Sequence, residues 1–297
     1  MNNNKHTDIM KAFKSRFSRM RLKIIQLGLF LLSTQVLFPQ EAQSINPILT
    51  DKFIINAGLF STLSTLKINA IGEGTDGGRL EDIDFDEQFN INDYQNTFSL
   101  TFTWRFAKNW NLSAEYFGVN RESEVVLKED IEWRDVTFKK GTGVKGGFDF
   151  ALYRAFIGRV IARGDHFEFG GGLGAHTIRI SPFIEGQAYV NDKEFEYQRN
   201  RVSSTLPLPN IGLWFIYAPT EKLSLNAKLD WFGIKVDNTA GELWDITPTL
   251  SYQVFRNVGV SVGYKYLTFG VDIDKPRWQK NIDLQFKGPS FSLFGNF

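Results

Sequence analysis

The chain alternates between apolar and polar residues over segments of about ten residues, and this period of two dominates the sequence after residue 50. Successive side chains of a β-strand point to opposite faces of the sheet. Each segment therefore predicts a strand with one fully apolar face and one face of small, polar or charged residues. The clearest examples are the segments 97–106, 110–116, 223–231 and 258–266.

Ten such strands are predicted, joined by short connections that alternate strictly with longer, more polar ones. This asymmetry is typical of membrane barrels, which have tight turns on one side and long loops on the other. Counts of eight or twelve strands stay open, and Lys128–Lys145 has the residues of an external hairpin. The predicted strands are 52–70, 95–107, 110–127, 146–162, 166–181, 205–218, 222–236, 244–255, 258–273 and 281–297, and the longer connections are Ile71–Tyr94, Lys128–Lys145, Pro182–Ser204, Asp237–Leu243 and Asp274–Lys280.

The N-terminal region has the order of a secretory signal. Basic residues cluster between positions 11 and 23, an uncharged stretch runs from Ile24 to Gln40, and small residues stand at Ala42 and Ser44. These are the three parts of a cleaved signal peptide. We expect cleavage after Ser44, with 1–44 as the signal peptide and 45–297 as the mature protein. The alternative is a membrane anchor, for which the apolar core is short.

Removing that segment changes the charge of the chain. The first 44 residues hold 7 Lys/Arg and 2 Asp/Glu, which leaves 27 basic and 31 acidic residues, a net charge of −4. Nucleic-acid binding needs clustered positive charge, so no nucleic-acid partner is expected. The chain has no cysteine, which excludes disulfides, thiolate metal sites and a thiol nucleophile.

The last strand ends on an aromatic residue. Phe291, Leu293 and Phe297 share one face of the segment 289–297. This ending resembles the C-terminal signature of Gram-negative outer-membrane β-barrels, which implies that Phe297 is an assembly signal for the outer-membrane assembly machinery. In lipid, only a closed sheet satisfies every strand hydrogen bond. We therefore predict an all-β, closed antiparallel transmembrane β-barrel in the cell outer membrane, exported by its signal peptide and surrounded by outer-membrane lipid and lipopolysaccharide.

Tryptophan and tyrosine recur near the ends of the apolar faces. Such amphipathic rings form belts where a membrane meets water. The predicted interface residues are Trp104, Trp110, Tyr116, Tyr217, Trp231, Tyr252 and Tyr266.

The polar faces carry charges of both signs. Ten strands make a narrow barrel, and barrels of similar size are filled by side chains rather than open to a wide pore. A lone charge in that space would be costly, so the interior charges are expected to form a paired network that rigidifies the barrel. A small polar conduit or ligand pocket among the same residues is the alternative. The residues assigned to this network are Arg105, Glu115, His176, Lys228, Asp230, Asp245 and Lys265.

No catalytic residue, metal site or cofactor is predicted. His176 lacks a recognisable motif, and a general base needs a partner within hydrogen-bond reach. Asp82, Asp84 and Asp86 form an acidic run, but the glycine and glutamate of an EF-hand loop are missing at the required positions. The Asp-x-His pair of ten-stranded omptin proteases is also absent, since Asp165 directly precedes His166.

Several motifs resemble those of a family of uncharacterised outer-membrane β-barrel proteins. The resemblance spans about residues 52–297 and implies a barrel without an established activity. The predicted function is thus a structural protein or a narrow channel or binding barrel with no known ligand. The alternatives are a lipid-modifying enzyme similar to lipid A deacylases, and an adhesin acting through external loops. The motifs are Ile83–Asp86, Trp104–Phe106, Ala114–Phe117, Gly147–Phe150, Leu206–Pro209, Leu229–Phe232 and Lys287–Ser290.

Overall fold

The computed structural model describes residues 45–72, 83–84, 88–89, 93–128, 130–133, 136–190, 193–201, 203–275 and 278–297. The expected signal peptide at 1–44, and Asp82 and Asp86 of the acidic run, lie outside these residues. In the part of the chain that is described, no helix is long and apolar enough to cross a membrane.

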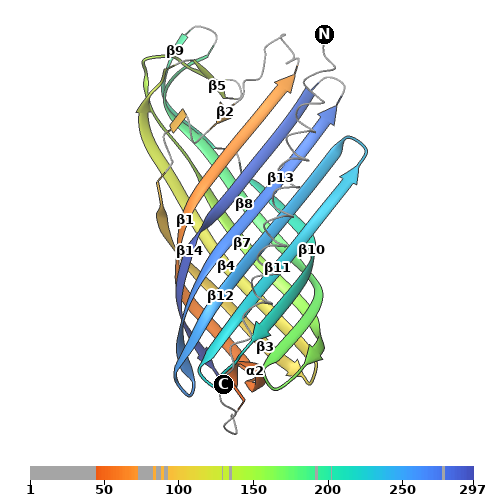
Figure 1. Ribbon diagram of the computed structural model, residues 1–297. Coiled ribbons are helices and arrows are strands. Elements are labelled where there is room, and N and C mark those ends of the chain that lie inside the picture. Colours follow the sequence, from red (N-terminus) through yellow and green to blue (C-terminus); the bar gives the residue numbers. More distant parts are fainter. Residues whose placement is uncertain are drawn as a thin grey trace, which may run out of the picture. The chain divides into compact units, whose positions relative to one another are not determined.

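Ten long strands form one closed antiparallel sheet, which confirms the predicted fold (Figure 1). Each strand pairs with the next of the ten, the first pairs with the last, and the pairing of β8 with β10 completes the ring. The strands are β1 (Phe53–Gly72), β3 (Gln95–Ala107), β4 (Trp110–Val126), β7 (Gly143–Arg163), β8 (Phe167–Val190), β10 (Ser204–Tyr217), β11 (Leu223–Val236), β12 (Thr239–Phe255), β13 (Val258–Lys275) and β14 (Trp278–Asn296).

The alternation of each strand separates an outer from an inner face. On β13, the side chains of Val258, Val260 and Val262 are exposed, whereas Ser261 and Lys265 are buried. This is the reverse of a soluble sandwich, in which the apolar side chains would be buried. The apolar face therefore covers the outside of the barrel, where it suits lipid.

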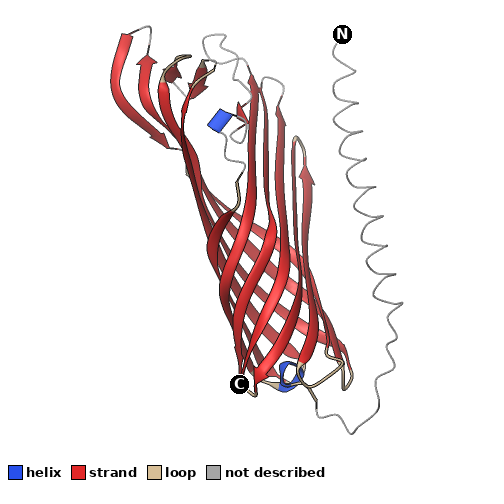
Figure 2. Cartoon of the chain, turned by 60° about the vertical axis from the view of Figure 1, so that its left-hand side comes forward, coloured by secondary structure: helices blue, strands red, loops and turns tan. Residues whose placement is uncertain are grey.

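Four short strands lie at the end of the barrel opposite the short helix α2 (Pro47–Thr50) (Figure 1). They are β2 (Ile83–Asp84), β5 (Ile131–Trp133), β6 (Val136–Phe138) and β9 (Lys193–Arg201). The pairing of β5 with β6 confirms the hairpin expected in Lys128–Lys145. Figure 2 shows that some strands continue beyond the others at this end.

Three of the long connections were predicted wrongly, because strands continue through them. In place of Pro182–Ser204, β8 runs on to Val190 and pairs with β9. In place of Asp237–Leu243, β12 begins at Thr239 after a tight turn in which Asp237 has a φ of 48°. In place of Asp274–Lys280, β13 extends to Lys275. Backbone pairing with the neighbouring strands continues through these stretches although their sequences do not alternate regularly.

The base of the barrel is covered by the residues before β1. Ile48 and Leu49 of α2 are buried against Ile54 and Ala218. The Asn46 side chain caps α2 by accepting from the Ile48 N–H, and its Nδ2 donates to the Thr220 carbonyl at 2.9 Å. The described chain thus begins by closing this mouth of the barrel.

The upper part of the interior is a hydrophobic core, which alternation alone had not predicted. Phe117, Phe150 and Phe286 are nearly fully buried, and the rings of Phe150 and Phe286 lie 4.3 Å apart between centroids. Phe89 is also fully buried in this core. Apolar side chains therefore fill the lumen above its charged residues.

Candidate functional site

Four of the predicted interior charges form one ion-pair cluster. Lys265 Nζ lies 2.5 Å from Glu115 Oε1 and 3.0 Å from both oxygens of Asp245. Lys228 Nζ pairs with the same two carboxylates, with its hydrogen bond to Asp245 Oδ2 at 3.1 Å. Each carboxylate therefore contacts both ammonium groups, which offsets the desolvation of all four charges.

Asp230 lies 4.0 Å from Lys228 Nζ of this cluster and is held by an arginine that the sequence did not reveal. Arg154 Nε and Nη2 donate to the two oxygens of Asp230 at 2.6 and 2.9 Å, in a bidentate pair. Asn210 Nδ2 donates to Asp230 Oδ1 at 2.9 Å. Arg154 and Asn210 were missed because the strands around them carry apolar residues on both faces, so their alternation gives no inward direction.

His176 is fully buried beside the two aspartates. Its Nε2 lies 3.7 Å from Asp245 Oδ2 and 3.9 Å from Asp230 Oδ2, and neither ring nitrogen has a hydrogen-bond partner among the described residues. These three residues have the donor types of a metal site. However, three carboxylates here already face three cations, Arg154, Lys228 and Lys265. A divalent cation would add uncompensated positive charge, so the charge balance opposes metal binding.

Arg105, the remaining predicted network residue, lies in a different cluster near the base. Its Nη2 contacts Glu168 Oε1 at 3.4 Å, and its Nη1 donates to the Asp51 carbonyl at 2.8 Å. The fully buried Glu168 also accepts from Arg163 Nη2 at 2.6 Å and from Trp214 Nε1 at 2.9 Å. This cluster holds the segment that covers the base.

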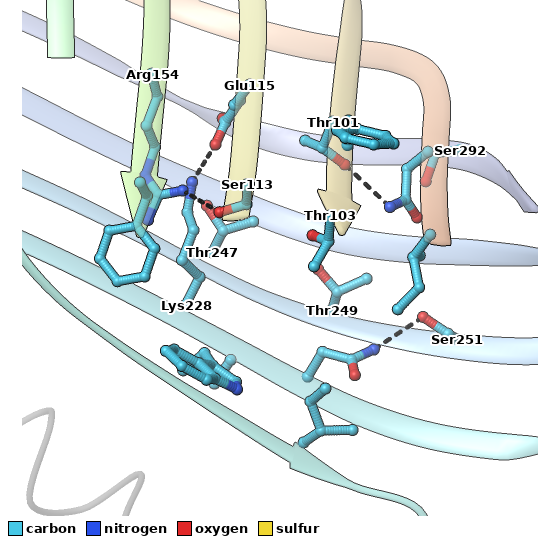
Figure 3. A pocket seen from close by; sticks show the side chains of 18 of the residues that line it. Thr101, Thr103, Ser113, Glu115, Arg154, Lys228, Thr247, Thr249, Ser251 and Ser292 are labelled. Carbon is cyan, nitrogen blue, oxygen red and sulfur yellow. Dashed lines mark hydrogen bonds and ion pairs between the residues drawn. The ribbon is translucent and has the colours of Figure 1, made fainter. Parts of the chain in front are cut away.

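A cavity of about 270 Å³ lies between the two clusters. Hydroxyl groups from several strands line it, and Figure 3 shows Lys228 and Arg154 beside their partners Glu115 and Ser113 at the same cavity. Arg154 Nη1 donates to Ser113 Oγ at 3.0 Å. These uncharged hydroxyl groups can donate hydrogen bonds to water and accept them from it. The hydroxyl residues are Ser99, Thr101, Thr103, Ser113, Thr247, Thr249, Ser251, Ser290 and Ser292.

Several of the ion pairs cross the lumen, whereas the pairs of Lys228 and Lys265 with Asp245 join neighbouring strands. Glu115 is on β4 and Lys265 is on β13, which are four strand positions apart in a ring of ten. Arg154 on β7 and Asp230 on β11 are three positions apart. The aromatic layer crosses in the same way, because Phe150 on β7 contacts Phe286 on β14, four positions away. Lys265 Nζ lies 5.2 Å from the Phe117 ring centroid and so joins the two layers.

The seven predicted interface aromatics lie on the outer face at two heights. Trp104, Trp110, Tyr217 and Tyr252 lie within five residues of the tight turns at the base. Tyr116, Trp231 and Tyr266 lie seven to nine residues above those turns, a climb of roughly 18–23 Å for strands tilted by about 40°. Trp231 packs on Trp244 with ring centroids 6.2 Å apart. Aromatic girdles of membrane barrels flank an apolar band about 25 Å tall, and the place of these seven residues at the membrane interface stays a prediction.

The C-terminal residue completes the pairing of the last strand with the first. The Phe297 carbonyl accepts from the backbone N–H groups of Lys52 and Phe53 at 2.6 and 2.8 Å. Its side chain is exposed on the outer face. The ring is therefore free of internal packing, and its role as an assembly signal stays a prediction.

Comparisons with known proteins place the fold among outer-membrane barrels. The outer-membrane protease OmpT of Escherichia coli aligns over 89% of this chain and 100% of its own, with 12% identity and a TM-score of 0.55. The outer-membrane protein OprG of Pseudomonas aeruginosa aligns over 86% and 98%, with 13% identity and a TM-score of 0.35. The attachment invasion locus protein Ail of Yersinia pestis aligns over 82% and 98%, with 13% identity and a TM-score of 0.32.

No protein-family model matches the chain, and no curated protein matches it. At 12% identity the likeness to OmpT concerns the fold and not the activity. The likeness to OmpT shows the β-barrel fold that the sequence resemblance implied.

Proposed function

We propose that this chain is a non-enzymatic outer-membrane barrel, exported by its N-terminal signal, whose lumen is closed by its own side chains. In this function the interior network rigidifies the wall, and the strands beyond the apolar band carry the external surface. Among the functions expected from the sequence, this choice favours a structural protein over a narrow channel.

One observation carries the proposal. Lys265 on β13 contacts Glu115 on β4 almost diametrically across the lumen, directly below the contact of Phe150 with Phe286. A hydrated ion would have to separate buried ion pairs and then pass a dry aromatic layer. Both steps are costly, because a buried charge that loses its partner carries its full desolvation penalty.

The position of His176 favours a non-enzymatic function. His176 is fully buried and lies next to Asp230 and Asp245 in the interior. Ser181 lies on the opposite face of β8, where its Oγ is 2.9 Å from Ser203 Oγ. A serine and histidine cannot exchange a proton from opposite faces of one strand. We therefore expect lipid A mass spectra of cells with and without the protein to be identical.

The closed lumen is tested by conductance in planar bilayers. The wild-type barrel is expected to produce no steady ionic current, because both crossing layers block the lumen. Parallel reconstitution into vesicles, with protease protection of the barrel, establishes that the silent protein is inserted. Reproducible single-channel steps from the inserted wild-type protein would overturn the proposed function.

A further inference from the structure

A polar patch interrupts the outer face of the barrel above its apolar band. On β8, the buried Ile178 and Ile180 point inward, so Arg179 between them points outward, where it is exposed. Arg179 pairs in register with Ala151 on β7 and Thr205 on β10, and Ser181 pairs with Asp149. Together with Arg201 and Ser203, these residues line a hollow of about 460 Å³.

The height of the patch is set by strand geometry. Arg179 follows the exposed Phe167 at the base of β8 by twelve residues. At about 3.4 Å per residue and a tilt near 40°, this is a climb of roughly 30 Å, against an apolar band about 25 Å tall. Below it on the outer face, Leu173 and Ile157 are apolar and exposed. Arg179 therefore lies where lipid chains give way to headgroups.

The two arginines of the patch differ in their partners. Arg201 Nη1 pairs with Asp149 Oδ2, and its guanidinium lies 5.2 Å from the Phe183 ring centroid. Within the described residues, Arg179 has no hydrogen bond or ion pair. The patch thus offers one fixed guanidinium, one guanidinium with all its donors available, and the hydroxyl groups of Ser181, Ser203 and Thr205.

We infer that this hollow binds a phosphate group of an outer-leaflet glycolipid of the lipid A type. A guanidinium can donate two parallel hydrogen bonds to a phosphate, and the neighbouring hydroxyls can bind the remaining oxygens or the sugar. The Leu173 and Ile157 side chains below lie where the acyl chains of the same molecule would run. The inference rests on the proposed outer-membrane location and adds a specific lipid partner and its site to it.

The test uses the barrel inserted into vesicles of neutral phospholipid. The vesicles contain either bisphosphorylated lipid A or a glycolipid with the same acyl chains and no phosphate, and the measurement is how tightly the barrel retains each lipid. The wild-type barrel is expected to retain the phosphorylated lipid at least about tenfold more tightly, since the lipid without phosphate cannot accept the charge-assisted hydrogen bonds of Arg179. Arg179→Gln should remove most of this preference. Inorganic phosphate at millimolar concentration should not compete, because it lacks the acyl chains.

Arg159→Gln is the matched control. Arg159 is also an exposed, outward arginine, but it lies on β7 near the base and pairs in register with Trp110. The Arg159→Gln variant should retain the phosphorylated lipid as tightly as the wild type does. The inference would be overturned if the wild type and Arg179→Gln retained the phosphorylated lipid equally, or if the wild type showed no preference for the lipid with phosphate. Neither result would contradict the proposed function as a closed barrel. Failure of the wild-type protein to insert into vesicles would instead overturn the proposed function, and this inference with it.

Discussion

Arg154→Met is expected to lower the free energy of unfolding by about 3–5 kcal/mol, the usual cost of removing one partner from a buried ion pair. Arg154 supplies two of the hydrogen bonds to Asp230, and both side chains are almost fully buried. Methionine has a similar volume, but the Asp230 carboxylate then keeps one hydrogen bond, from Asn210. Among the described residues, no other potential cation is closer to this carboxylate than His176 at 3.9 Å and Lys228 at 4.0 Å. Urea unfolding of the barrel in lipid vesicles, followed by tryptophan fluorescence, measures the change.

The double variant Arg154→Met/Asp230→Leu separates charge from packing. It removes the orphaned carboxylate, so most of the lost stability should return. Lys139→Met is the matched control at an exposed pair, since Lys139 contacts Asp130 at 3.1 Å with both side chains more than two-fifths exposed. It should leave the urea midpoint unchanged. A double variant as unstable as Arg154→Met would contradict the role assigned to the buried charge.

Gly288→Val is expected to prevent closure of the barrel, with a destabilisation above about 4 kcal/mol. Gly288 is a buried residue of β14, and a Cβ atom at this position would overlap the carbonyl oxygen of Ser61 on β1. The pairing of β1 with β14 joins the first strand of the barrel to the last. A backbone atom cannot move aside as a flexible side chain can, so the two strands must separate. Folded yield in vesicles, read from resistance to protease, measures the effect.

Gly143→Val is the matched control, because it makes the same glycine-to-valine change at a site without close neighbours. Gly143 is an exposed residue at the start of β7, and a Cβ atom there meets nothing within 4 Å. Valine favours strands, so this variant should fold like the wild type. If Gly288→Val folded with the same yield as Gly143→Val, the close approach of β14 to β1 would not be needed for closure.

Sequence patterns were sufficient where one face of a strand is uniform. β3 has the bounds of the predicted strand 95–107, and β4 begins at residue 110 as predicted. The patterns were insufficient where both faces are apolar, as around Arg154, because side-chain periodicity then gives no inward direction. They were also insufficient at Thr239–Leu243, where strand formation depends on hydrogen bonds to β11 and β13 rather than on side-chain hydrophobicity. The aromatic layer was missed for the same reason as Arg154. Phe117 and Phe150 lie on inner faces, but their strands also carry apolar residues on the outer face, so the sequence did not show which way these rings point.

The order of apolar and polar residues along the chain determined that each strand has one apolar and one polar face, because successive side chains of a strand point to opposite faces whatever its neighbours are. The N-terminal signal, the terminal Phe297 and the opposed charges of the polar faces indicated that the apolar face is the outer one. The tertiary structure decided which interior charges meet. Glu115 and Lys265 are 150 residues apart, and their contact depends on strand tilt, on stagger and on closure of the ring. These are properties of the whole sheet and have no local signature in the sequence.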